Sequence, residues 1–379
     1  MNLIELSRYT RKDTQKIALI EDVLSETRVL KSMSFDMVSE KCCDMDEPYL
    51  EERLKTCPKC GKKYLKDENF CFDCLVSLND IKQIDIKSLD VKHDFTVRKT
   101  NTYNSFDYIF TTDNLIKIND FDFERKNFSK IIKNIKSTAL QSIDTAIKEN
   151  DIDLEELSAL EKVLLFAKAF VDVEYKSYGQ ELGYYSFNTI YIDDRQLDAL
   201  QITTLLHELT HFLVKEILTQ ILCSLLDASK TRELESIITF ILSYSKQNCL
   251  IDEYAAHTVE GRFTLFGYQD YSSFLSIEKE IDMSKDEIEM LKTIGNTFAH
   301  IIKTIVESFI NANMLTEIKS QFRNDILDSP NYSQLSQENC TILNYEGFFQ
   351  AVQFILTEGF AYASENLEKI IQINEMWDK

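Results

Sequence analysis

Residues 203 to 214, TTLLHELTHFLV, carry two histidines and a glutamate in a segment that is otherwise largely apolar. The leucines and the phenylalanine of this segment would hold a helix in the core and leave the polar trio facing a cleft. We therefore predict a long helix over about 196–226. The alternative is a helix whose histidines are ordinary core or surface residues. The chain has only 5 histidines in 379 residues, so two of them at this spacing favour a functional site.

His207 and His211 are separated by one helical turn, so both imidazoles project from the same face of the predicted helix. This is the spacing that two ligands of one tetrahedral zinc ion need. Glu208 lies about 100° around the helix from His207, close to the metal but outside its ligand set. At this position Glu208 can take a proton from a metal-activated water and pass it to a leaving amine.

A catalytic zinc needs a third protein ligand, and residues 248–263, NCLIDEYAAHTVEGRF, are the best source. We predict Glu253 as this ligand. His257 follows one turn later on the same face and could hold a metal ligand in place, donate to the oxyanion of the transition state or itself be the third ligand. Asp252 could orient one of the histidines by accepting its other N–H, or could replace Glu253 as a ligand. A solvated acidic helix face is the remaining alternative.

Two CxxC pairs in CPKCGKKYLKDENFCFDC place Cys57 with Cys60 and Cys71 with Cys74. Two such turns bring four thiolates to one ion in a closed tetrahedral site, so this second zinc would be structural. The segment resembles a short zinc ribbon. A redox dithiol is the alternative, but the βαβ context of such motifs is missing. We expect the ribbon to dock a protein partner or to stabilise the fold, because bound metal supplies folding energy that so short a segment lacks.

Glycine and proline are scarce, with 8 Gly and 3 Pro in the chain, which favours long helices over a turn-rich β fold. Clustered aromatic and β-branched residues at 171–194 predict a small hairpin or sheet edge, and weak strand signals occur at 94–100 and 106–112. The predicted fold class is α+β, mostly helical with a small sheet. Helical patterns cover residues 1–40, 123–150, 153–173, 196–226, 230–247, 249–266, 284–313 and 346–375.

The formal net charge of −21 disfavours general binding to nucleic-acid phosphates or anionic membranes. The locally basic stretch 53–66 leaves a small nucleic-acid contact open. The apolar runs at 162–170 and 235–242 fall short of a membrane span, and the first residues lack the order of a secretion signal. We therefore expect a cytoplasmic protein.

The motif HELTH, followed by DEYAAH on a later helix, resembles the zincin superfamily of metallopeptidases. The subgroup with a glutamate on the following helix, the gluzincins, is the most similar. The order of the strand NTIYIDD, the HELTH helix and the DEYAAH helix is also similar to minimal peptidases of the ImmA/IrrE type. The resemblance covers about residues 165–265. It implies zinc on His207, His211 and Glu253, and Glu208 as general base.

The chain departs from two zincin patterns. It lacks the further glycine and third histidine of metzincins, and DEYAAH stands where thermolysin-like enzymes have NExxSD. In zincins, an edge strand beside the site pairs with an extended peptide. Residues 184–193 would supply such a strand here, unless they form a core strand.

We therefore expect a zinc-dependent peptidase with one catalytic and one structural zinc ion and a protein or peptide substrate. The expected domains are an N-terminal helical segment (1–50), a zinc ribbon (51–78) and a zincin-like metallopeptidase domain with C-terminal helices (79–379). One alternative is a regulatory or binding protein whose zincin-like domain is weakly active or inactive. The other is a zinc hydrolase of non-peptide amides.

Overall fold

A computed structural model describes residues 54–57, 59–65, 70–71, 74, 76–77, 84–95, 105–176, 182–264, 267–268, 272–326, 332–333 and 341–377. The chain divides into two compact units, Met1–Ile84 and Asp85–Lys379. In the first unit, β1 (Leu54–Thr56) pairs antiparallel with β2 (Lys63–Leu65). Likewise, β3 (Phe70–Cys71) pairs antiparallel with β4 (Val76–Ser77). The helical segment predicted for residues 1–50 lies outside the described residues.

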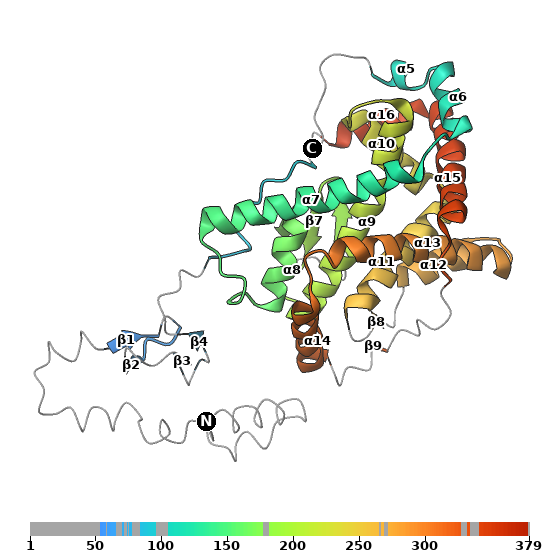
Figure 1. The fold of residues 1–379 in the computed structure, drawn as a ribbon. Helices are drawn as coiled ribbons and strands as arrows, with labels where there is room; N and C mark the ends of the chain where they lie inside the picture. The colour runs from blue at the N-terminus through green and yellow to red at the C-terminus, as the bar shows by residue number, and fades with distance from the viewer. Residues whose placement is uncertain are drawn as a thin grey trace, which may run out of the picture. The chain divides into compact units, whose positions relative to one another are not determined.

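The second unit is mostly helical and contains a small mixed sheet, so the predicted α+β class is confirmed (Figure 1). Its helices are α5 (Ser105–Ile109), α6 (Thr112–Asp120), α7 (Arg125–Asn150), α8 (Ala159–Lys168), α9 (Asp198–Leu226), α10 (Arg232–Tyr244), α11 (Lys246–Phe263), α12 (Ser272–Glu280), α13 (Lys285–Val306), α14 (Ala312–Ile326), α15 (Tyr345–Glu365) and α16 (Leu367–Met376). A two-stranded pair joins β8 (Gly267–Tyr268) to β9 (Tyr332–Ser333).

The mixed sheet contains β5 (Asp172–Tyr175), β6 (Gly183–Ser186) and β7 (Thr189–Ile192) in the order β5-β7-β6. β5 runs parallel to β7, and β6 forms the predicted hairpin with it. β6 is therefore an edge strand of the described sheet. A Cβ atom on Gly183 would lie 2.4 Å from the carbonyl oxygen of Tyr191 and 2.6 Å from Cγ2 of Thr204. The missing side chain thus lets β6 lie directly against α9.

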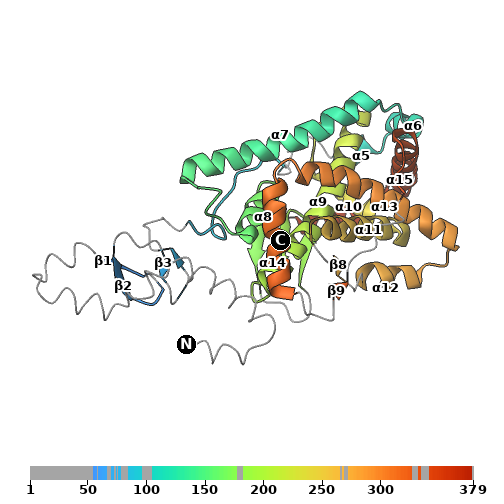
Figure 2. The ribbon, with the colours of Figure 1, turned by 60° about the horizontal axis from the view of Figure 1, so that its bottom comes forward.

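Helix α9 forms the centre of the second unit and packs against α8, α10, α11 and β6 (Figure 2). Its 29 residues span about 44 Å at the usual helical rise. By length and composition alone α9 could cross a membrane, contrary to the expectation from shorter apolar runs. However, 83% of its apolar window is buried inside the protein, as in the core helix of a folded domain.

Sequence predictions about the type or the boundaries of elements were wrong in several places. Residues 106–112, expected as a weak strand, lie mostly in α5 and at the start of α6, whose cap Thr111 accepts a hydrogen bond from the Asn114 N–H at 3.3 Å. The helix expected over 284–313 ends at Val306, and Asn311 caps a separate helix, α14. The helix expected over 346–375 breaks at Asn366. At both helix breaks an asparagine side chain bonds to the backbone of a helix end, Asn311 at the start of α14 and Asn366 at the end of α15.

An ion cluster lies buried beside α9. The Lys230 ammonium lies 2.5 Å from Glu216 and 2.8 Å from Glu235, and it donates to the carbonyl of Phe95 at 2.8 Å. Both glutamate side chains are fully buried. Burial alone would lower the pKa of Lys230, but the two carboxylates outweigh it and raise the pKa. The ammonium is therefore a counter-ion that two buried carboxylates share.

Replacing this ammonium should be costly. Lys230→Met should lower the free energy of unfolding by about 3–5 kcal/mol, because two buried carboxylates lose their counter-ion. Denaturant unfolding at neutral pH measures the loss. The matched control is Lys246→Met, which removes an exposed pair with Glu280 and should change stability little. Equal stability of the two variants would contradict the structural role of the cluster.

Candidate metal centre

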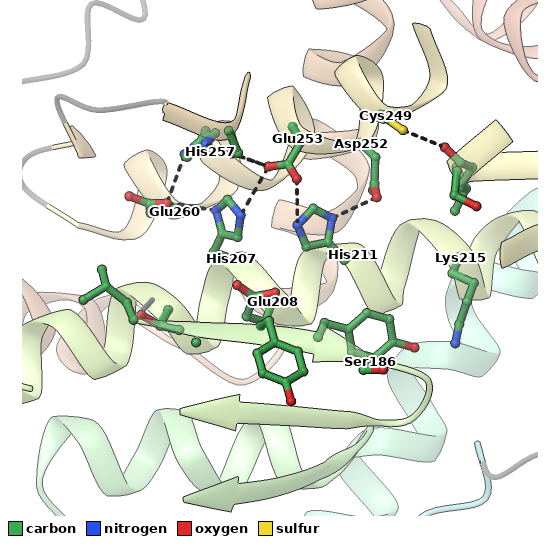
Figure 3. A pocket seen from close by; sticks show the side chains of 18 of the residues that line it. Ser186, His207, Glu208, His211, Lys215, Cys249, Asp252, Glu253, His257 and Glu260 are labelled. Carbon is green, nitrogen blue, oxygen red and sulfur yellow. Dashed lines mark hydrogen bonds and ion pairs between the residues drawn. The ribbon is translucent and has the colours of Figure 1, made fainter. Parts of the chain in front are cut away.

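Two helices build the site, and Figure 3 shows their side chains meeting across a cavity of about 920 Å³. α9 supplies His207, Glu208 and His211, because four-residue spacing puts both histidines on one face. α11 packs along α9 and supplies the acidic residues opposite. The side chain of Ser245 caps the start of α11 by accepting from the Asn248 N–H at 3.2 Å.

The structure brings His207, His211 and Glu253 together. The Nε2 atom of His207 lies 3.6 Å from Oε2 of Glu253, and Nε2 of His211 lies 3.9 Å from Oε1. The three ligand atoms all lie within 4.8 Å of one another. A tetrahedral zinc ion with bonds of about 2.1 Å holds its ligands about 3.4 Å apart. Two nitrogens and a carboxylate at nearly this spacing fit such an ion.

The other ring nitrogen of each histidine is held by a carboxylate from α11. The His211 Nδ1–H donates to Asp252 at 2.8 Å, the orienting role predicted for this aspartate as one option. The His207 Nδ1–H donates to Glu260 at 3.1 Å. With Nδ1 engaged by a carboxylate, Nε2 is the atom of each ring that remains to bind a metal ion, and it faces Glu253.

Glu260 was not recognised from the sequence as part of the site. It is 3% exposed and follows Glu253 by two helical turns on α11, so the two share a face. That spacing was the available signal. It becomes informative only once α11 is known to lie along α9, because the spacing alone does not distinguish Glu260 from other acidic helix residues.

His257 lies beside the predicted ligands and links two of the carboxylates. Its Nε2 is 3.0 Å from Oγ of Ser273, and the Ser273 hydroxyl donates to Glu253 at 2.6 Å. Its Nδ1 lies 3.4 Å from Glu260. Ser273 lies in the first turn of α12. It was not identified from the sequence as part of the site. The Ser273 hydroxyl thus links His257 to the Glu253 carboxylate.

A second set, His207, His257 and Glu260, also has ligand atoms within 4.8 Å of one another. An ion there would compete with the hydrogen bond between His207 and Glu260. It would also leave His211 unused. The first set employs the Nε2 atoms of both motif histidines, so the geometry favours Glu253 over His257 as third ligand.

The site carries more negative than positive charge. Burial alone would lower the pKa of His207, but the hydrogen bonds it donates to the carboxylates of Glu253 and Glu260 raise the pKa well above its usual value. Burial also lowers the pKa of His211, but the neighbouring Asp252 carboxylate outweighs this effect and raises the pKa to about 9. Burial would raise the pKa of Glu260, yet bonds from His207 and His257 lower it to about 2. These carboxylates favour a cation between them.

Glu208 lines the cavity with 8% of its surface exposed. In Figure 3 it lies below the two histidines, between α9 and the sheet. The sequence offers Tyr184, Tyr185 and Tyr254 as positional candidates for an oxyanion donor, and of these Tyr184 and Tyr185 line the cavity. Tyr254 instead packs against Phe274, with ring centroids 5.2 Å apart.

In the first unit, Cys57, Cys60 and Cys74 have sulfur atoms within 4.8 Å of one another. The Lys59 N–H lies 3.4 Å from the Cys57 sulfur, and Gly61 has a φ of 74° that lets the chain turn back. The backbone of Cys71 belongs to β3, but its side chain lies outside the described residues. Three thiols so close together are a donor set suited to zinc.

No family model matches the chain, and no curated protein or solved structure matches it.

The carboxylates behind the histidines should tune metal affinity. Asp252→Ala and Glu260→Ala should each weaken zinc binding at this site about 10–100-fold, because each frees one imidazole to rotate and change tautomer. Competition with a chromophoric chelator measures the affinity. Glu358→Ala removes an exposed carboxylate of α15 that does not line the cavity and serves as control. Wild-type affinity in both cavity variants would refute this role.

Proposed function

We propose that the protein is a zinc-dependent peptidase. The observation that carries the proposal is the orientation of the two motif histidines. Each has its Nδ1 on a carboxylate of α11 and its Nε2 facing Glu253. Two unrelated core histidines would not be expected to share this arrangement. Here each ring is bound by its own carboxylate, and the same nitrogen of both rings faces one glutamate.

His207, His211 and Glu253 would hold a zinc ion, which when bound would supply the Lewis acidity that polarises a scissile carbonyl and acidifies water. Glu208 is the general base: it accepts a proton from the attacking water and returns it to the leaving amine. Its position on α9 beside His207, with its carboxylate at the cavity, suits this task. Asp252 holds the imidazole ring of His211, and Glu260 holds that of His207.

The edge strand β6 offers a place for an extended peptide. The Asp193 N–H donates to the carbonyl of Leu182 at 3.1 Å, which identifies this pair as hydrogen-bonded. Because bonded pairs alternate along an antiparallel ladder, the backbone groups of Gly183 and Tyr185 point to the open edge. Both residues line the cavity. An added peptide strand would therefore lie beside Glu208 and the metal ligands.

The resemblance to gluzincins supports the same function, with the cysteine module as a structural zinc ribbon that docks a partner or stabilises the fold. We also propose a cytoplasmic location. A peptide substrate is favoured over a small amide because the cavity runs along a strand edge rather than ending at the metal ligands.

The metal content should be two zinc ions per chain, measured by elemental analysis. Mild chelation should remove one, because the cysteine site is closed. Glu253→Ala should lose the removable ion and keep the other, whereas His257→Ala should keep both. One ion or none in the unaltered protein would contradict the proposal. Retention in Glu253→Ala with loss in His257→Ala would assign the third ligand to His257.

Glu208→Gln should reduce peptide hydrolysis by about 10²–10⁴-fold while both zinc ions remain, because the amide cannot accept the proton. The variant is nearly isosteric, so retained zinc content shows that the site is intact. Comparing cleaved protein termini after incubation with the unaltered and variant proteins gives both activity and substrate preference. Full activity in the variant would eliminate the proposed mechanism.

A further inference from the structure

The hairpin between β6 and β7 turns through an unusual backbone conformation. Ser186 pairs with Thr189, so the turn consists of Phe187 and Asn188. Phe187 has a φ of 55°. Hairpin turns with positive φ favour glycine, asparagine and aspartate, and a bulky aromatic residue rarely adopts this region. Contacts from outside the turn must therefore hold Phe187.

Two side chains hold Phe187, one at its carbonyl and one at its ring. The Lys215 ammonium donates to the Phe187 carbonyl at 2.8 Å. The rings of Phe187 and Trp377 meet edge to face, with centroids 4.9 Å apart. Lys215 Nζ also lies 5.0 Å from the centre of the Trp377 ring and 4.9 Å from that of Tyr185. We call Phe187, Lys215 and Trp377 the hairpin clamp.

The clamp connects the hairpin to the helix that carries the metal ligands. Lys215 follows His211 by one turn on α9 and is only 3% exposed. Figure 3 shows it beyond His211 at one end of the cavity, extending from α9 toward the sheet. A single rigid helix thus bears both the candidate metal ligands and the group that holds the tip of the edge strand.

Trp377 follows α16, and its own position is fixed by a second helix. Its Nε1–H donates to Oγ of Ser236 on α10 at 3.2 Å, and α16 packs along α10. Residues from three separate parts of the sequence therefore meet at the tip of one hairpin, and Ser236 of α10 holds one of them, Trp377. A two-residue turn does not require a buried ammonium and a tryptophan in order to form. We take their presence to mean that the position of this turn matters.

We infer that Lys215 and Trp377 are positioning residues for the peptide, because they hold the open edge of β6 at a set distance from the metal ligands. This inference rests on the proposed function. Displacing β6 would weaken the binding of an extended peptide. Glu208 and the metal ligands belong to α9 and α11, which do not depend on the clamp for their positions. The clamp therefore acts on substrate binding rather than on the chemical step.

The kinetic test compares Trp377→Ala with Trp377→Phe in the zinc-loaded, full-length protein. Trp377→Ala should raise KM for a peptide about tenfold and leave kcat within about twofold, the pattern expected when binding alone is lost. Trp377→Phe should restore KM, because an aromatic ring still covers Phe187. Lys215→Met should also raise KM. Unchanged KM in Trp377→Ala, or a fall in kcat with loss of zinc, overturns the inference.

Amide hydrogen exchange provides a readout independent of activity. Residues 183–192 should exchange faster in Trp377→Ala but not in Trp377→Phe, while the middle of α9 stays protected. Tyr362→Ala is the matched control, since Tyr362 packs against Phe240 of α10, away from the hairpin. Unchanged exchange of residues 183–192 in Trp377→Ala would overturn the inference that the hairpin clamp holds β6 in place. Failure of the unaltered protein to cleave any peptide counts instead against the proposed function.

Discussion

The site depends on the packing of α11 against α9, and above all on two hydrogen bonds between a histidine and a carboxylate. α9 is buried along most of its length, so its polar residues need partners that a core rarely offers. Asp252 and Glu260 supply them. α13 supports α11 from another side: a Cβ on Gly295 would lie 2.7 Å from the carbonyl of Ile251. Because α11 is held between α9 and α13, its carboxylates stay directed at the two histidines.

The parts of the site that follow from spacing within a helix could be predicted from the sequence. His207 and His211 share a face by their four-residue spacing, and the acidic segment after them pointed to Glu253. Glu260 and Ser273 could not be chosen, because their roles depend on how α11 crosses α9 and where α12 returns. Such relations arise from tertiary packing, which a pattern along one chain does not encode.

In the fold, too, features set by local sequence could be predicted, whereas features set by tertiary packing could not. Scarce glycine and proline, with apolar periodicity, predicted a mostly helical chain and a small sheet. Helix ends were less predictable. The apolar pattern continues across the break between α13 and α14, where Asn311 starts a new helix with its side chain. Aromatic residues near 106–112 suggested a strand, but Phe110 packs against Phe360 of α15 with ring centroids 5.0 Å apart, and packing against another helix overrides local preference.

Gly183 has a consequence for recognising distant relatives of this chain. Any side chain at this position would collide with both the neighbouring strand and α9, so substitution there is far more restricted than at the cavity-lining tyrosines that follow. Divergent sequences of the same architecture should keep a glycine at the start of the edge strand, ahead of the HExxH helix. They should also keep two acidic residues, two turns apart, on the helix that corresponds to α11. A search that combines these separated positions would find homology that overall sequence identity no longer reveals.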